Sequence, residues 1–350
     1  NMKLALKLAE RGFLSDSLIR IGIRKLLKNR INEIDSGNCE IHTRRLQSFI
    51  SDMDESPIAC NTQEANDQHY ELPPLFFQKV LGNNLKYSSC YYPIGNEPLD
   101  KAESAMLELY GERAQLTDNL DILELGCGWG SLTLWMAKNY PESRITAVSN
   151  SAPQKIFIDE QCNKLNISNV KVLTADMNEF QTDDHFDRII SIEMFEHLRN
   201  YRRMLNRICQ WLRNDGKLFI HIFVHKKNPY LFEIKDDNDW MSKYFFTGGM
   251  MPSDDLPHYF QDRFKLDDHW RVSGTHYSKT SRHWLEKLDA HKDEILPIFA
   301  DTFGKRQSKL WFQRWRIFFM SCEELFGFNN GQEWWVSHYL MTKRESYSKA

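Results

Sequence analysis

The sequence predicts an α/β fold in which helices cover both faces of a mainly parallel sheet. Short apolar runs alternate with helical patterns between residues 98 and 224, one run ends in a glycine-rich turn, and titratable residues follow another run. This alternation is typical of parallel sheets that bind ligands at the carboxyl ends of their strands. A chain of 350 residues can bury a sizeable core without disulfides or a structural metal.

The N-terminal part predicts two short amphipathic helices within residues 3–30, with a break between Gly12 and Ser17 and an N-cap at Ser15 or Ser17. Their basic faces fit docking on the protein's own domain or on a second subunit of a homodimer, with contact to an anionic membrane as the alternative. Residues 52–68 are polar, acidic and rich in turn-forming residues, which predicts a linker or a mobile stretch.

The elements of the sheet are predicted from residue 98 onward. A helix at 99–110 is followed by strand 121–125, helix 130–139, strand 144–149, helix 151–164, strand 169–174, strand 186–192, helix 196–213 and strand 216–224. The last third departs from this alternation, with a strand at 265–272, long helices at about 278–303 and 307–325, and a final strand at 334–343. Aromatic residues gather there, and we expect most of them in the helix core and some in an apolar substrate pocket.

Composition excludes several classes of protein. The formal net charge of −3 gives no broad basic field for nucleic acid, and no apolar run approaches the ~18–20 residues that span a bilayer. Seven scattered cysteines without a C-x-x-C pair argue against a disulfide framework or a zinc site. We therefore expect a reducing, cytoplasmic compartment, no nucleic-acid partner and no secretory signal.

A glycine-rich turn follows the apolar strand at 121–125. It contains Gly126, Gly128 and Gly130, and Glu124 stands two residues before the first glycine. A carboxylate inside the turn would oppose a pyrophosphate, and the dinucleotide fingerprint places its third glycine one residue later. The same carboxylate suits the positive charges of S-adenosylmethionine, while the glycines let the backbone approach the ligand. The turn therefore predicts S-adenosylmethionine as cofactor, with an ordinary strand-to-helix turn as the alternative.

Three titratable residues, Glu193, Glu196 and His197, follow the apolar run at 186–192. In a helix they would occupy positions i, i+3 and i+4 and share one face. The set matches neither H-E-x-x-H nor H-x-x-E-H, so no metal is expected, and N-terminal capping would explain one glutamate but hardly two and a histidine. Methyl transfer needs a neutral amine, whereas free amines have a pKa near ~10. Carboxylates that hold the ammonium and a histidine that takes its proton fit this chemistry.

Several blocks of the sequence carry a resemblance to a known family. They are Gly126–Gly130, Ser191–His197, Tyr244–Gly249 with Met251–Ser253, Gly274–Tyr277 and Phe326–Gly331. From about Tyr70 to Lys343 the chain resembles the coclaurine N-methyltransferase family of plant alkaloid biosynthesis and, more distantly, cyclopropane fatty acid synthases and mycolic acid methyltransferases.

The resemblance implies a class I Rossmann-like methyltransferase fold with a mostly parallel seven-stranded sheet. Residues 71–345 are then expected to form this domain, with a helical substrate cap inserted around 228–330. Residues 1–70 are expected to supply the N-terminal helices and linker.

Roles for individual residues also follow from the resemblance. Glu193 and His197 are expected to bind and deprotonate the substrate amine, with Glu196 beside them. The implied cofactor contacts are Tyr87, Ser88, Gly126, Gly128, Asn150, Gln154, Asp176 and Met177, in addition to Glu124. The expected substrate contacts are Tyr277, His221, Phe326, Trp334 and Cys90. For His221 and Tyr277 the alternative is a core residue whose polar atoms are satisfied beside the pocket.

The cyclopropane synthases that the chain more distantly resembles use a bound bicarbonate as base, held by a glutamate, a histidine and a tyrosine near a cysteine. Here Glu196, His221 and Tyr277 match that set, Ser89 stands at the cysteine position with Cys90 following, and Glu193 replaces a residue that is usually small. A carboxylate at position 193 would repel bicarbonate and attract an ammonium ion.

The sequence therefore predicts an S-adenosylmethionine-dependent N-methyltransferase that acts on a small, aromatic-ring-bearing amine of the coclaurine type. Carbon methylation or cyclopropanation of a lipid is the alternative, and a catalytically inactive cofactor-binding scaffold is the minor one. The pattern does not specify which amine is methylated.

Overall fold

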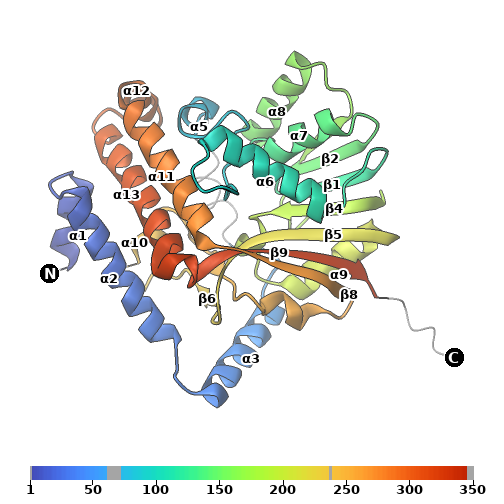
Figure 1. The fold of residues 1–350 in the computed structure, drawn as a ribbon, viewed down its shortest axis with the longest axis horizontal. Coiled ribbons are helices and arrows are strands. Elements are labelled where there is room, and N and C mark those ends of the chain that lie inside the picture. The colour runs from blue at the N-terminus through green and yellow to red at the C-terminus, as the bar shows by residue number, and fades with distance from the viewer. Residues whose placement is uncertain (1, 61–71, 236–238, 345–350) are drawn as a thin grey trace.

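The computed structural model describes residues 2–60, 72–235 and 239–344, and a seven-stranded sheet forms its centre (Figure 1). The strand order is β3 (Val170–Thr174), β2 (Arg144–Ser149), β1 (Asp121–Leu125), β4 (Phe186–Ile192), β5 (Leu212–His225), β9 (Trp334–Lys343) and β8 (Phe264–Val272). All neighbouring pairs from β3 to β5 are parallel, and β9 runs antiparallel to both of its neighbours. The predicted mostly parallel seven-stranded sheet is confirmed.

The strand order places the functional residues at one edge of the sheet. Strands β1 and β4 are neighbours at its centre, and the strand order reverses here because β2 and β3 lie on one side and β5 on the other. Parallel sheets bind ligands at such a reversal, outside the carboxyl ends of the strands. The glycine turn after Leu125 and the segment after Ile192 both lie at that place.

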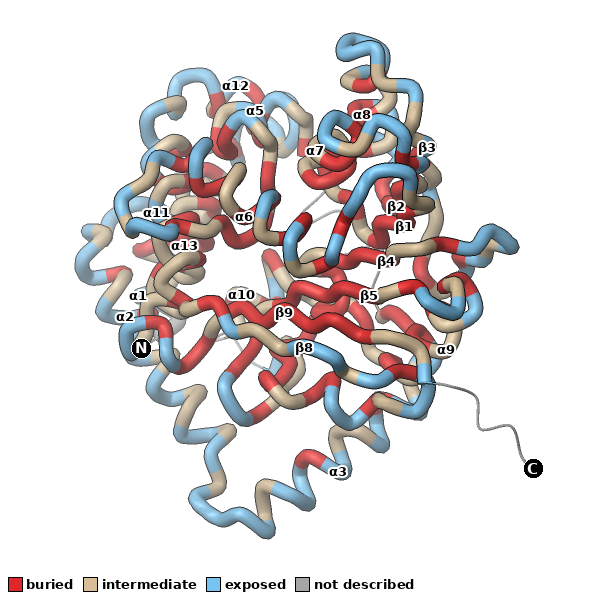
Figure 2. The backbone as a smooth tube through the Cα atoms, turned by 45° about the vertical axis from the view of Figure 1, so that its right-hand side comes forward, coloured by how far each residue is buried: buried red, intermediate tan, exposed pale blue. Residues whose placement is uncertain are grey.

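Helices cover both faces of the sheet (Figure 1). The helices α6 (Leu99–Arg113), α7 (Ser131–Asn139) and α8 (Ala152–Lys164) lie on one face, and α9 (Tyr201–Trp211) lies on the other. Figure 2 shows that the strands at the centre are largely buried, whereas the outward sides of the helices are exposed. The apolar runs read from the sequence are therefore strands covered on two sides.

The helix predicted at 196–213 begins later than expected, which corrects the prediction. Phe195–His197 forms a single 3-10 turn, and α9 starts at Tyr201 with Asn200 as its N-cap. Between them Leu198 pairs with Ala59, and the N–H of Arg199 donates to the carbonyl of Ile58 at 2.6 Å. This long-range pairing uses backbone groups that a helix would have bonded internally.

The N-terminal part contains three helices in the described residues: α1 (Met2–Glu10), α2 (Asp16–Ile34) and α3 (Cys39–Glu55). The two predicted helices and the cap at Ser15 are confirmed, since its side chain accepts from the N–H of Leu18. The predicted linker is wrong at its start: residues 52–55 belong to α3, and Ile58 is buried. Residues 61–68 of the predicted linker lie outside the described residues. None of the described helices is long and apolar enough to cross a membrane.

The C-terminal part adds helices and a small second sheet at one end of the main sheet. It contains α10 (Trp240–Tyr244), α11 (Gly274–Ala290), α12 (Lys292–Phe303) and α13 (Ser308–Gly327), and β6 (Tyr230–Leu231) pairs with β7 (Met250–Met251). The long helix predicted at 278–303 is two helices, because the chain breaks at His291. Strand β8 belongs to the main sheet, so the predicted cap is divided around it.

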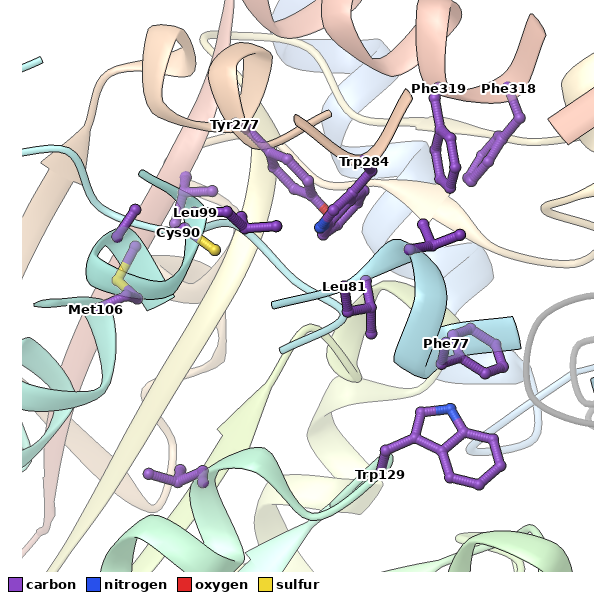
Figure 3. Packing of buried hydrophobic residues seen from close by; sticks show 14 of the residues in the cluster. Phe77, Leu81, Cys90, Leu99, Met106, Trp129, Tyr277, Trp284, Phe318 and Phe319 are labelled. Carbon is purple, nitrogen blue, oxygen red and sulfur yellow. The ribbon is translucent and has the colours of Figure 1, made fainter. Parts of the chain in front are cut away.

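Aromatic packing on the short helix α5 (Pro74–Val80) joins this helical part to the glycine-rich turn. Helix α5 carries Phe77, which lies beside Trp129 with ring centroids 5.1 Å apart (Figure 3). The neighbouring Phe76 packs on Phe299 of α12 and on Trp315 of α13, with ring centroids 5.2 and 4.9 Å apart. Most C-terminal aromatics are buried in this core, as expected.

Candidate active site

A cavity opens at the carboxyl ends of β1, β2 and β4 and contains about 1110 Å³ of open space. Eight of the nine predicted cofactor residues line it: Tyr87, Ser88, Glu124, Gly126, Gly128, Asn150, Gln154 and Met177. Asp176 is the exception, since its carboxylate caps the N–H of Asn178 while its neighbours Ala175 and Met177 face the cavity.

The turn at Gly126 and Gly128 needs glycine for backbone reasons. Both residues have positive φ, at 80° and 53°, which L side chains rarely adopt. A Cβ on Gly126 would also lie 2.9 Å from the side chain of Met194, whereas open space surrounds the one on Gly128. The turn therefore brings backbone atoms to the cavity wall, where a ligand can approach them closely.

Glu124 is a buried carboxyl at the base of this cavity. Its carboxyl group accepts a hydrogen bond from Thr133, and burial raises the pKa of Glu124 to about 8. A cation that binds beside it would favour the charged form, because an opposite charge lowers the pKa of a carboxyl. Two buried donors of the cavity wall, the Gln154 amide and the Trp129 indole N–H, have no partner among the described residues. The carboxyl fits a positively charged group and the two donors fit acceptor atoms of the same ligand, as S-adenosylmethionine offers both.

Glu193 stands directly after β4 in an unusual backbone conformation. Its φ is 47°, and its N–H donates to the carbonyl of His221 at 2.8 Å. The prediction that Glu193, Glu196 and His197 share one face of a helix is therefore wrong. They lie instead on a tight turn whose first residue is left-handed and whose last two belong to the 3-10 turn.

The carboxylate of Glu193 accepts three hydrogen bonds. Its Oε1 accepts from the backbone N–H of Ser89 and from Nε2 of His221, both at 2.9 Å, and its Oε2 accepts from the hydroxyl of Tyr277 at 2.7 Å. Burial raises the pKa of Glu193, and Lys86 and these hydrogen bonds oppose that effect. His221 and Tyr277, expected near the substrate, thus bind the central carboxylate directly.

Glu196 is a second carboxyl beside the first. It is fully buried, its Oε1 accepts from the N–H of Phe223 at 2.8 Å, and its Oε2 has no partner among the described residues. Burial and the neighbouring Glu193 raise the pKa of Glu196 well above its ordinary value. The two neighbouring carboxyls thus disfavour each other's charged form.

His197 lies against an aromatic ring at the edge of the cavity. Its ring packs on Phe246 with centroids 4.8 Å apart, and it lines the cavity together with Glu193. Burial lowers the pKa of His197 to about 4, while the charge of Glu193 acts in the opposite direction. The imidazole is therefore neutral at pH 7 and has a lone pair to accept a proton.

Aromatic side chains surround this group of titratable residues. Phe326 stacks on Tyr277 with centroids 4.2 Å apart, and Phe223 lies between Phe326 at 6.0 Å and Phe246 at 5.7 Å. Phe326 was expected from the sequence, whereas Phe223 and Phe246 were not. Phe223 lies two residues after His221 in β5, so both side chains are on the same face of the strand. The strand pattern alone does not show which face of the strand reaches a pocket.

Two predicted substrate residues lie elsewhere in the contact network. Trp334 is fully buried, donates its indole N–H to Tyr230 and packs on His225 and Phe328. Cys90 is also buried, and its N–H donates to Thr280 at 3.0 Å. Burial raises the pKa of the Cys90 thiol strongly, so this group stays neutral.

Sequence reasoning missed a buried lysine behind the site. Nζ of Lys86 donates to the carbonyl of Ser89 and to the hydroxyl of Tyr110, both at 2.8 Å, and to the hydroxyl of Ser88. These contacts hold the segment that presents the Ser89 N–H to Glu193. A single lysine between polar residues carries no periodic signal that would have marked it as buried.

Known proteins are similar to this chain over most of its length. The chain is 41% identical over 343 residues to (S)-coclaurine N-methyltransferase of Thalictrum flavum subsp. glaucum, which covers 97% of this chain and 95% of that protein. A crystal structure of coclaurine N-methyltransferase bound to N-methylheliamine and SAH superposes with a TM-score of 0.94 at 38% identity, covering 97% of this chain and 99% of that one. The chain belongs to the coclaurine N-methyltransferase family.

The relationship extends to cyclopropane synthases. The family described as mycolic acid cyclopropane synthetase matches residues 59–334. Cyclopropane-fatty-acyl-phospholipid synthase of Escherichia coli (strain K12) is 30% identical over 241 residues, which is 68% of this chain and 60% of that protein. As a member of the coclaurine N-methyltransferase family, this protein is an S-adenosylmethionine-dependent methyltransferase, and the predicted cofactor is confirmed.

Proposed function

We propose that this protein methylates the nitrogen of a secondary or tertiary amine that carries an aromatic ring, of the benzylisoquinoline type. The observation that carries the proposal is the carboxylate of Glu193, which is held by three neutral donors inside an aromatic enclosure. No cation among the described residues bonds this carboxylate directly, because the pKa of His221 is far below its usual value and its ring is neutral. A substrate ammonium supplies the missing positive charge.

The residues around the amine have separate tasks. When bound, S-adenosylmethionine supplies an electrophilic methyl group. Glu193 holds and orients the substrate ammonium, and His197 accepts its proton. Glu196 supports the imidazole of His197 or the substrate. The pKa of His197 is about 4 in the free protein, with the effect of the Glu193 charge included, so its ring is unprotonated when the amine arrives. The rings of Phe246 and Phe326 face the apolar part of the amine and favour its positive charge.

The contacts of Glu193 also weigh against lipid cyclopropanation. His221 and Tyr277 belong to the set that holds bicarbonate in the resembling synthases, and both already donate to Glu193. The carboxylate thus occupies two of the donors that a bicarbonate would need. Its negative charge would also repel that anion.

One experiment separates these activities. The protein would be incubated with S-adenosylmethionine labelled in its methyl group, a panel of secondary and tertiary amines that includes coclaurine, and vesicles of unsaturated phospholipid. Mass spectrometry should find the label on an amine nitrogen with a mass increase of one methyl group. Labelled cyclopropane lipid with no labelled amine would refute the proposal.

The cellular setting proposed from the sequence is a cytoplasmic one. All seven cysteines are free thiols, and Cys90, Cys127 and Cys162 are buried. Free thiols are typical of reducing compartments, which supports this placement.

A further inference from the structure

A row of side chains runs from Glu193 across strands β5 and β9 to the end of α6. Nε2 of His221 lies 2.9 Å from Glu193, and its Nδ1 lies 3.0 Å from Nε2 of His338. Nδ1 of His338 lies 2.8 Å from the guanidinium of Arg113 at the end of α6. His221 and His338 face each other across the β5–β9 ladder and are fully buried, whereas Arg113 is half-buried and lies over the ring of Trp270.

The chemistry of arginine determines the direction of these hydrogen bonds. A guanidinium can only donate, so Nδ1 of His338 accepts and its proton must be on Nε2. That N–H then donates to Nδ1 of His221, which places the proton of His221 on Nε2. His221 in turn donates to the carboxylate of Glu193. Every bond in the row thus points from Arg113 toward Glu193.

A second branch reaches the same atom. The hydroxyl of Tyr110 lies 2.8 Å from Nδ1 of His221 and 2.8 Å from Nζ of Lys86. An ammonium at Lys86 donates to the oxygen of Tyr110, whose own proton then points to Nδ1 of His221. A hydroxyl can accept as well as donate, so the Tyr110 branch fits the tautomer that the row sets for His221 but does not fix it without Arg113.

We propose that Arg113 is a positioning residue for the methyl transfer, because it fixes the tautomers of His338 and His221 and so keeps a donor on Glu193. The inference rests on the proposed function, in which an ionised Glu193 holds the substrate amine. The burial of both histidines and the nearby charges of Arg113 and Lys86 lower the pKa of His221 and of His338 far below the usual value, which supports a row of neutral rings.

The direction of the row also decides what it cannot do. A proton on Glu193 cannot move to Nε2 of His221, because that nitrogen already has a proton. Arg113 cannot accept one at the other end. The row therefore keeps a donor on Glu193 and does not carry the substrate proton to the surface.

Other titratable groups face Glu193 from every side, and a change at Arg113 leaves them all in place. They are His197 and Glu196 from the same turn, Lys86 and Cys90 from the segment after α5, Tyr110 from α6, Tyr277 from α11 and Cys322 from α13.

The test reads the tautomers directly in the whole protein. The wild-type protein labelled with ¹⁵N-histidine would be examined by long-range ¹H–¹⁵N NMR without amine, and the signals would be assigned with His338→Gln and His221→Gln. We expect both rings to be neutral and to carry their proton on Nε2 from pH 6 to pH 9. A proton on Nδ1 of His221 in the wild-type protein would overturn the proposal, whatever substrate the enzyme uses.

Variants then test the role of Arg113. In Arg113→Met, Nδ1 of His338 is free to take the proton, and His221 can then turn its own proton from Glu193 to Nε2 of His338. A carboxylate that loses a donor has a higher pKa, so the acidic limb of kcat/KM should move up by about one pH unit. Arg113→Lys keeps a donor and should keep the wild-type tautomers and profile. Arg188→Met is the matched control, since Arg188 is also half-buried and bonds the carbonyls of Ala114 and Gln115 after α6. An Arg113→Met protein with wild-type tautomers and profile would refute the inference.

Discussion

Glu193→Gln removes the charge from the site while its hydrogen bonds can be kept. Oε1 of Glu193 accepts two bonds and Oε2 accepts one. An amide oxygen in place of Oε1 still accepts from Ser89 and His221, and the amide NH₂ in place of Oε2 can donate to the hydroxyl of Tyr277, which turns to accept. The variant should therefore fold and bind SAH as the wild-type protein does.

The expected loss follows from the charge alone. Two unit charges about 4 Å apart attract by about 4 kcal/mol at an effective dielectric constant near 20. At about 1.4 kcal/mol for each factor of ten, kcat/KM for the protonated amine at pH 7 should fall by about 10³-fold. Higher pH should reduce the difference, because a neutral amine does not need the carboxylate for its binding.

Initial rates with labelled S-adenosylmethionine, measured from pH 6 to pH 10 at several amine concentrations, test this reasoning. Glu333→Gln is a matched control, because the Glu333 side chain is similarly buried, at 6% exposed against 9% for Glu193, but bonds His225 and Lys226 outside the cavity. It should keep wild-type methyl transfer. A Glu193→Gln protein that binds SAH normally and stays within about threefold of the wild-type kcat/KM at pH 7 would show that Glu193 does not hold the ammonium.

Three further predictions concern single groups of the site. His197→Ala should lower kcat by roughly 10²–10⁴-fold, the usual range for a general base, with partial recovery at high pH; a rate loss that is the same at every pH would exclude His197 as the proton acceptor. The pKa of Glu124 is about 8 in the free protein, so cofactor binding should release protons below pH 8 and should become tighter as the pH rises toward 8. Calorimetry in buffers of different ionisation enthalpy measures both effects, and both should be absent in Glu124→Gln. Tyr277→Phe removes one of the donors to Glu193 and should raise the pKa of the acidic limb of kcat/KM by about one unit; an unchanged limb would show that this hydrogen bond does not stabilise the carboxylate.

The parallel sheet could be predicted from the sequence because its strands are covered on both sides. Residues 121–125, 144–149 and 186–192 are compact apolar runs, and the structure has β1, β2 and β4 with these same bounds. The helix boundaries were harder where a distant segment decides them. Nothing local to Met194–Asn200 indicates that Ile58 and Ala59 pair with this stretch and end the helical pattern.

The cofactor side of the site was also predictable, since the glycine turn and Glu124 form one continuous motif. The substrate side was only partly predictable, because its residues come from β4, β5, α11 and the segment after α5. Lys86 and Arg113 show the reason most clearly. Their roles depend on which atoms of Tyr110 and His338 lie opposite them, and that is a property of the β5–β9 ladder and not of either sequence segment.

The backbone of Glu193 links the fold to the chemistry. A left-handed φ is unfavourable by roughly 1 kcal/mol for a residue with a Cβ, and at Glu193 it is held by the bond from its N–H to the carbonyl of His221. The side chains of the same two residues are also hydrogen-bonded. Two contacts, one of main chain and one of side chain, therefore fix the carboxylate relative to β5, which is part of the rigid sheet. The position of the charge is thus set by the sheet, and the aromatic residues of α13 and of the segment around Phe246 enclose the amine around a fixed point.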